Sequence, residues 1–219
     1  QFGRRSARHR FLLNTDYWLL TTSPSLSYTS PMDVVVDIDR PGGGARVQRF
    51  SHEAMATIFE VYVAHADAHY AAQAAHEAFA LIGRLERELS RFLPNSDIGR
   101  INGLAAGEAT QVSPTTIECL LIARHMYDLT GGAFDISIGT GLPALELDAG
   151  ACVVRASAAG VRLDLGGIGK GYAVDLAAEL LEEWGLERAL VHGGFSSVLA
   201  LEPGTSHGGW PLTLSDPAS

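Results

Sequence analysis

The stretch Leu163-Asp164-Leu165-Gly166-Gly167-Ile168-Gly169-Lys170-Gly171-Tyr172 predicts a strand, a glycine-rich bend and the start of a helix. Glycines let a backbone approach a ligand closely and point amide N–H groups at it. The helix N-terminus adds partial positive charge, and Lys170, the only lysine in the chain, adds a full charge. The pattern favours binding of an anion such as a phosphate, with Asp164 at the strand end facing the same ligand.

This bend does not match the familiar nucleotide-binding loops. A P-loop requires glycine where Asp164 stands and Ser or Thr where Gly171 stands, and a dinucleotide fingerprint beginning at Gly167 requires glycine at Tyr172. Two interpretations therefore stay open. One is an anion site, and the other is a tight strand-to-helix turn that carries a solvated lysine.

Helices are expected wherever apolar residues recur three and four positions apart between start and stop signals. Three stretches meet that description: Asp67 to about Phe92, Ser113 to Gly131-Gly132, and about Lys170 to Trp184. The first of them has a continuous apolar stripe, formed by Ala75, Phe79, Ile82, Leu85, Leu89 and Phe92.

Strands are expected where apolar residues alternate or run briefly between turn signals: Thr57–Val63, Cys152–Val154, Val161–Leu165, Arg188–His192, Ser196–Leu201 and Trp210–Leu214. Strands and helices are mixed but do not alternate regularly. The fold class expected is therefore α+β, with mixed sheets and packed helices.

Composition excludes several classes of protein. The 219 residues include 16 basic and 25 acidic side chains, and a net charge of −9 argues against non-specific nucleic-acid binding. Cys119 and Cys152 have no C-x-x-C spacing, which excludes a zinc ribbon and a disulfide scaffold. No apolar stretch approaches the roughly 20 residues of a membrane span.

The two ends of the chain carry little fold information. We expect residues 1–45 to form a poorly ordered extension. They begin with basic residues and an apolar run that polar residues interrupt, and they end in the flexible stretch Gly42-Gly43-Gly44. No clean export signal is visible there, so the compartment stays undefined. Residues 210–219 look like a strand that enters a turn, so we expect residues 46–219 to be a domain without its C-terminal part.

A second informative motif is Thr130-Gly131-Gly132-Ala133-Phe134-Asp135. It presents an aromatic ring and a carboxylate on a loop directly after a helix end. Taken alone, the motif favours a helix C-cap in which Phe134 fills the core.

Five segments together resemble one family, the FAD:protein FMN transferases or ApbE family, once called thiamine biosynthesis lipoproteins. They are similar to the family's motifs in type and order: Ala54–Thr57, Leu89–Phe92, Asn95–Asn102, Thr130–Asp135 and Leu163–Asp175. The last two are the most specific. The resemblance covers the folded part almost completely.

The resemblance implies a set of residues that contact FAD: Met55, Phe92, Ala133, Phe134, Asp135, Asp164 and Lys170. It also implies that the backbone carbonyl of Gly167 binds magnesium. Phe92 stands where the family usually has tyrosine, Gly167 where many relatives have alanine, and Ala56 where the family usually has glycine.

Members of the resembled family transfer the FMN half of FAD to a threonine of a target protein and release AMP, and some relatives hydrolyse FAD instead. Attack on a diphosphate needs charge neutralisation and positioning, which a metal ion and Lys170 would supply. The implied partners are FAD, Mg²⁺ and a flavin-acceptor protein, with no nucleic acid.

The family's Asp and Thr metal ligands would lie beyond residue 217. We therefore expect the 219-residue chain to be inactive or weak alone, and two alternatives stay open: a non-catalytic FAD- or FMN-binding module, and a structural fragment. Other signals are weaker. His65, His69 and His76 are read as a solvated helix start rather than a metal face, Cys119 as a core residue, and His192 as structural.

Overall fold

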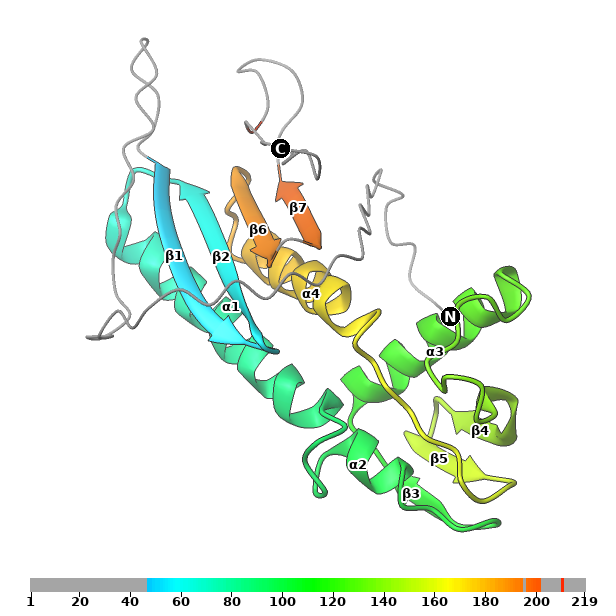
Figure 1. Cartoon of the computed structure of the whole chain (residues 1–219). Helices are drawn as coiled ribbons and strands as arrows, with labels where there is room; N and C mark the ends of the chain where they lie inside the picture. The colour runs from blue at the N-terminus through cyan, green and yellow to red at the C-terminus, as the bar shows by residue number, and fades with distance from the viewer. Residues whose placement is uncertain (1–46, 195, 202–209, 211–219) are drawn as a thin grey trace, which may run out of the picture. The chain divides into compact units, whose positions relative to one another are not determined.

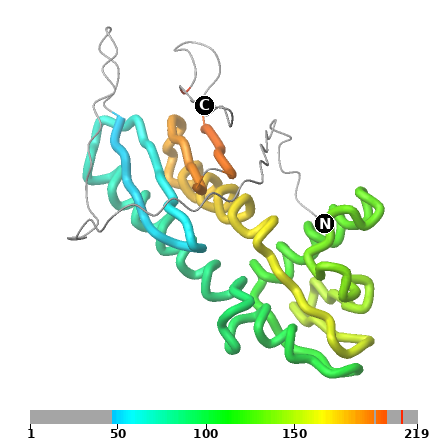
Figure 2. Tube along the Cα trace, in the orientation of Figure 1, coloured from blue at the N-terminus to red at the C-terminus, as the bar shows by residue number. Residues whose placement is uncertain are grey.

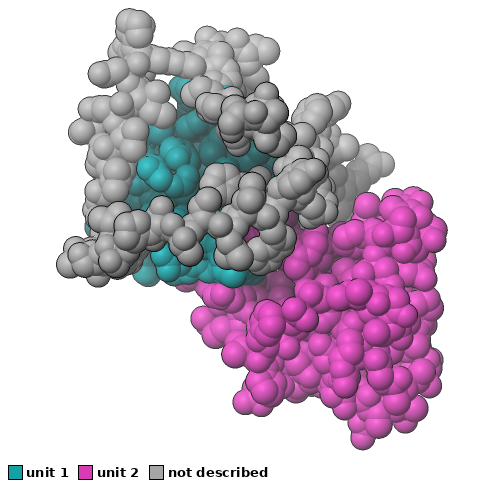
Figure 3. Space-filling view, in the orientation of Figure 1, with its two compact units in different colours: residues 1–78, 174–219 teal, residues 79–173 magenta. Residues whose placement is uncertain are grey.

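The computed structural model describes residues 47–194, 196–201 and 210 (Figures 1 and 2). The chain divides into two compact units, unit 1 with residues 1–78 and 174–219, and unit 2 with residues 79–173 (Figure 3). The expected extension over residues 1–45 and nearly all of the expected strand Trp210–Leu214 lie outside the described residues.

Unit 1 contains a four-stranded antiparallel sheet of order β1-β2-β6-β7 (Figure 1). Its strands are β1 (Val47–Ala54), β2 (Thr57–Ala64), β6 (Ala189–Gly193) and β7 (Ser197–Leu201). The predictions for β2, β6 and β7 are confirmed to within one residue at each end. β1 pairs with β2 as a hairpin in which Ala54 lies opposite Thr57, so the loop has two residues.

Helices cover one face of this sheet (Figure 1). On β2, Phe59, Val61 and Val63 are fully buried, whereas Ile58 on the opposite face is 50% exposed, as the alternation predicts. The approach is close at β6, where a Cβ placed on Gly193 would lie 2.8 Å from the Val174 side chain. A side chain at position 193 would clash with Val174, which explains why the residue there is glycine.

The first long helix, α1 (Ala68–Leu89), begins as expected, because the Asp67 carboxylate accepts hydrogen bonds from the first-turn amides. Its predicted end at Phe92 is wrong, and so is the place of Phe92 in the apolar stripe, since this side chain is 78% exposed. Two features end the helix early. The Ser90 hydroxyl accepts from the Phe92 amide, and Pro94 disfavours helical backbone at Leu93.

Unit 2 is built mainly from α2 (Asp97–Ile101), β3 (Ala109–Gln111), α3 (Pro114–Leu129), the 3₁₀ helix η1 (Leu142–Ala144), β4 (Leu145–Asp148) and β5 (Val153–Ala156). The strands form an antiparallel sheet of order β3-β5-β4. The expected start of α3 is confirmed, because the Ser113 hydroxyl caps it and Pro114 follows. The last helix, α4 (Gly169–Glu183), runs from unit 2 into unit 1.

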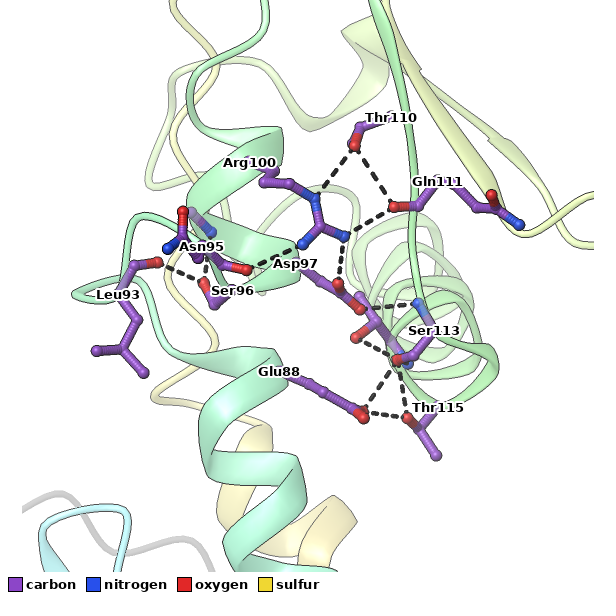
Figure 4. A network of polar contacts seen from close by, with 12 residues as sticks. Glu88, Leu93, Asn95, Ser96, Asp97, Arg100, Thr110, Gln111, Ser113 and Thr115 are labelled. Atoms are coloured by element: carbon purple, nitrogen blue, oxygen red, sulfur yellow. Dashed lines mark hydrogen bonds and ion pairs between the residues drawn. The ribbon is translucent and has the colours of Figure 1, made fainter.

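A polar network joins the end of α1, α2 and the start of α3 (Figure 4). Asp97 is buried; its Oδ1 lies 2.6 Å from Arg100 Nη2, and its Oδ2 accepts from the Ser113 amide at 2.8 Å. Glu88 accepts from the hydroxyls of Ser113 and Thr115 at 2.9 and 2.5 Å. Both carboxylates thus accept hydrogen bonds from the start of α3, which ties this helix start to α2 and to the end of α1 within unit 2.

The two antiparallel sheets with packed helices confirm the α+β class. In the ranges that the structure describes, no helix combines the length and apolar character needed to cross a bilayer.

Candidate functional site

The segment Val161–Leu165 leads into the glycine-rich bend but is not the expected strand. It has no regular secondary structure and pairs with no strand in the described residues, although Val161, Leu163 and Leu165 are buried and Arg162 between them is exposed. Its backbone groups bond to side chains and a loop instead. The Thr140 hydroxyl accepts from the Arg162 amide at 2.9 Å and lies 3.2 Å from the Arg162 carbonyl oxygen. The apolar pattern predicted which side chains are buried, but the predicted strand is absent and the partners of the backbone are side chains and a loop.

Asn102 and Ile136 hold the next two residues of the segment. The Asn102 side-chain amide pairs with both backbone groups of Leu163, and the Asp164 amide donates to the Ile136 carbonyl at 2.8 Å. The segment before the bend is thereby tied to the loop that follows Asp135. The two glycine-rich motifs of the sequence are therefore neighbours in unit 2.

The bend itself is tight and exposed, and leads into α4 as predicted. The Leu165 carbonyl accepts from the amides of Ile168 and Gly169 at 3.0 and 2.7 Å, and Asp164 Oδ1 accepts from the Gly166 amide at 2.9 Å. Gly166 and Gly167 are both exposed. A Cβ on Gly166 would lie only 3.2 Å from Asp164 Oδ1, so glycine permits the carboxylate to fold over the bend.

Phe134 lies against this bend. A Cβ placed on Gly167 would be 3.5 Å from Phe134 Cε2, which is ordinary van der Waals contact. The Thr130 hydroxyl positions the ring by accepting from the Phe134 amide at 2.9 Å. Phe134 is half-buried rather than a core side chain, and Ala133 is exposed. The structure therefore presents the ring beside the glycines.

Asp135 is bound by its own loop. Its Oδ1 accepts from the amide and hydroxyl of Ser137 at 2.8 and 2.7 Å, and its Oδ2 accepts from the Gly139 amide at 2.8 Å. Burial alone would raise the pKa of Asp135, but these hydrogen bonds outweigh it and the pKa lies below its ordinary value. Asp135 is thus an ionised residue that shapes the loop after Phe134.

Asp164 pairs with a residue that the sequence did not single out. Its Oδ2 lies 3.2 Å from Arg91 Nε, and the Arg91 guanidinium carbon lies 4.5 Å from the centre of the Phe92 ring. Phe92 is thereby placed beside Asp164 through Arg91. The sequence offered one signal, the position of Arg91 directly before a predicted ligand residue, but the distant carboxylate is brought there only by the fold.

Lys170 occupies the first turn of α4 and is half-buried. In the described part of the chain, its ammonium group has no hydrogen-bond or ion-pair partner. A cation at a helix N-terminus is disfavoured by the helix dipole, so its position there is better explained by a ligand than by the helix.

Met55 belongs to unit 1, where it forms the two-residue loop of the β1–β2 hairpin with Ala56. Their φ angles are +51° and +57°. Such loops favour glycine or asparagine, because positive φ strains other residues. The hairpin thus holds Met55 in a strained turn, a feature often found at functional positions.

The described residues fit a magnesium site only in part. The Gly167 carbonyl belongs to an exposed residue, and no described residue donates to it. Magnesium prefers six oxygen ligands, usually with a carboxylate. Among the described residues no three His, Cys, Asp or Glu side chains gather as a metal site, and this holds for His65, His69 and His76 too. Unit 2 therefore offers one oxygen ligand at the bend.

Cys119 agrees with its reading as a core residue, whereas the reading of His192 as a satisfied structural residue is not borne out. Cys119 is fully buried, and burial raises the pKa of its thiol to about 12, so it is an inert core residue. His192 is half-buried in β6 opposite Glu60, and its Nδ1 has no partner among the described residues.

Comparison with known proteins places this geometry in context. A sequence profile described as the ApbE family matches residues 55–143 and 140–219. In a sequence search, no curated protein matches the chain.

Solved structures match the fold at low identity. A mutant of the flavin transferase ApbE from Vibrio cholerae aligns with TM-score 0.70 and 19% identity over 80% of this chain and 66% of that one. The apo flavinyl transferase ApbE from Pseudomonas stutzeri aligns with TM-score 0.65 and 22% identity over 74% of this chain and 62% of that one. The ApbE protein from Thermotoga maritima aligns with TM-score 0.70 and 22% identity over 80% of this chain and 65% of that one. The chain spans less than two thirds of each of these proteins.

Proposed function

Because the chain belongs to the ApbE family, we propose that it acts as an FAD:protein FMN transferase. The reaction moves the FMN half of FAD to a threonine hydroxyl of an acceptor protein. The threonine oxygen forms a bond to the FMN phosphorus, the bond from that phosphorus to the bridging oxygen breaks, AMP leaves with that oxygen, and the hydroxyl proton passes to a base or to solvent.

One observation supports this proposal above the others: the Phe134 ring lies beside Gly167 in the bend that joins Asp164 to Lys170, so close that a Cβ at Gly167 would be 3.5 Å from Cε2. Two motifs far apart in the sequence thus bring a half-buried aromatic ring beside exposed glycines that stand between a carboxylate and a cation. These groups suit a ligand that combines a flat ring system, hydroxyl groups and a diphosphate.

The residues divide naturally by chemistry. Phe134 and the exposed Phe92 would contact the ring systems, and Asp164 would accept hydrogen bonds from ligand hydroxyl or N–H groups. Lys170 and the bend amides would neutralise the diphosphate. Met55, Ala133 and Asp135 complete the proposed FAD-binding set. We assign the base to no described residue.

Magnesium would complete the neutralisation of the leaving AMP when it is bound. In the proposal the Gly167 carbonyl would be one oxygen ligand of the ion. The chain itself fixes the shape of the bend, because the Leu165 carbonyl accepts hydrogen bonds from two amides of the turn.

A second candidate is a non-catalytic FAD- or FMN-binding module. It is favoured by the metal-ligand count, since the described residues supply a single magnesium ligand at the bend. This module would bind FAD through the same residues but would release no AMP.

Two measurements on the full chain separate the candidates. Quenching of flavin fluorescence reports FAD binding, and chromatography reports AMP released with Mg²⁺ or with EDTA. Binding with Mg²⁺-dependent AMP release supports the transferase, because water can stand in for the acceptor. Binding without AMP release supports the module. Absence of binding overturns both.

A further inference from the structure

We propose that Arg91 is a phosphate-binding residue of the FAD site, an inference that rests on the proposed function. It offsets the charge of Asp164 beside the bend and offers its terminal N–H groups to the ligand's diphosphate. The starting observation is the contact of Arg91 Nε with Asp164 Oδ2 at 3.2 Å.

The charge balance at the bend requires a second cation. From Asp164 to Lys170 the ionisable groups are one carboxylate and one ammonium, so their formal charges cancel. Phe134 lies beside Gly167, and the next residue, Asp135, is ionised. Without Arg91 the surface would thus repel a diphosphate. With Arg91 paired to Asp164, the ammonium of Lys170 and the bend amides can attract one.

The guanidinium has donors to spare. Its contact with Asp164 uses Nε, and the Phe92 ring covers one face. In the described part of the chain, these are its only partners. The two terminal nitrogens therefore keep their N–H groups, in the planar fork that suits phosphate oxygens.

Stability does not explain the pair. The side chains of Arg91 and Asp164 are 47% and 30% exposed, and exposed ion pairs contribute little to folding. The stacking partner Phe92 is itself 78% exposed, so the cluster buries little apolar surface. An exposed guanidinium that is held by a carboxylate at Nε and by a ring on one face is preorganised for a ligand instead.

A different reading of the contacts is that Arg91 only supports the Phe92 ring. The two readings differ in the part of the ligand that they affect. A phosphate contact acts on FAD and not on riboflavin, which has no phosphate. Support of the ring acts on both ligands equally.

The test compares FAD and riboflavin binding by the full chain and by Arg91→Met, Arg91→Lys and Arg84→Met. Arg84 is an exposed residue of α1 and controls for general loss of charge. We expect Arg91→Met to weaken FAD binding about tenfold to a hundredfold, with riboflavin binding changed less than about twofold. Arg91→Lys, which keeps the charge without the fork, should fall between, and Arg84→Met should match the wild type.

Other outcomes overturn the inference in different ways. Equal losses for FAD and riboflavin would assign Arg91 to the ring alone. Unchanged FAD binding in both Arg91 variants, beside normal wild-type binding, would remove Arg91 and leave the proposed function standing. A wild-type chain that binds no FAD would remove both. Circular dichroism melting shows whether Arg91→Met folds. If it does not fold, the comparison of FAD and riboflavin binding is made with Arg91→Lys.

Discussion

The side-chain amide of Asn102 pairs with both backbone groups of Leu163: Nδ2 donates to the carbonyl oxygen at 3.1 Å, and Oδ1 accepts from the amide at 2.6 Å. One side chain thus replaces a neighbouring strand for the residue directly before Asp164. The position of the Asp164 carboxylate depends on this pair, because the segment has no sheet to hold it.

Asn102→Ala should therefore destabilise unit 2 by about 1–3 kcal/mol, the net worth of two hydrogen bonds in a partly buried setting. It should also weaken FAD binding, since the Leu163–Asp164 backbone is released. Urea denaturation and hydrogen exchange at the Leu163 amide measure the two effects. Asn95→Ala, at an exposed asparagine in the preceding turn, is the control. Slow exchange at Leu163 in Asn102→Ala would contradict the prediction.

Lys170→Ala should weaken FAD binding by about tenfold or more, because it removes a charge-assisted contact to the diphosphate. His69→Ala, at an exposed position near the start of α1, is the matched control and should bind as the wild type does. Titration calorimetry with FAD measures both. Equal effects of the two substitutions would remove Lys170 from the site.

Ala56→Gly should stabilise the chain by about 0.5–1 kcal/mol. The φ angle of +57° at Ala56 strains alanine but not glycine, and the gain is reduced by the greater freedom of glycine in the unfolded chain. Ala80→Gly, at an exposed position inside α1, should instead lose about 1 kcal/mol. Thermal melting of both variants tests the contrast in sign, and a loss at both positions would refute the strain.

Acid should destabilise unit 2 through Asp97. Burial would raise the pKa of this carboxyl, but hydrogen bonds from Ser113 and Thr116 and the charge of Arg100 outweigh it, so the pKa is lowered in the fold. As the pH falls, the Asp97 carboxyl is therefore protonated at a higher pH in the unfolded chain than in the folded chain. The stabilisation is present above the ordinary value of 3.8 and is lost as the pH falls through the lower, folded pKa.

Asp97→Asn should be less stable than the wild type at pH 7 and should lose less stability between pH 5 and pH 2. Urea denaturation across that range measures both effects. Glu146→Gln, which removes an exposed charge, serves as the reference. A variant whose stability falls as steeply in acid as the wild type would exclude Asp97 as the source.

The helices were predictable because their signals are local. Asp67 and Ser113 cap their own helices within a few residues, and no distant partner is needed. β1, β3 and β4 were missed; for β3 and β4 the reason is that three or four residues carry too little pattern. The strand expected at Val161–Leu165 failed for another reason: alternation predicts extended backbone, but Asn102 and Thr140 took the place of a strand.

The site was predictable where one motif contained its own geometry. The bend from Asp164 to Lys170 and the loop at Phe134 could be read as separate motifs, but their contact depends on the Asp164–Ile136 hydrogen bond, which the fold creates. Arg91 could not be identified from spacing, because its partner lies in a different element. The family resemblance supplied Met55 and Phe92, which no local chemistry would have selected.

Asn102 is followed by Gly103, and an Asn-Gly pair can undergo slow deamidation. Without a side chain on glycine, the next backbone nitrogen can attack the asparagine carbonyl and expel ammonia, and water then opens the resulting ring, which leaves a carboxylate in place of the amide. The product would set an oxygen without a hydrogen against the Leu163 carbonyl. Ageing of a stored preparation would then loosen the backbone before Asp164 first.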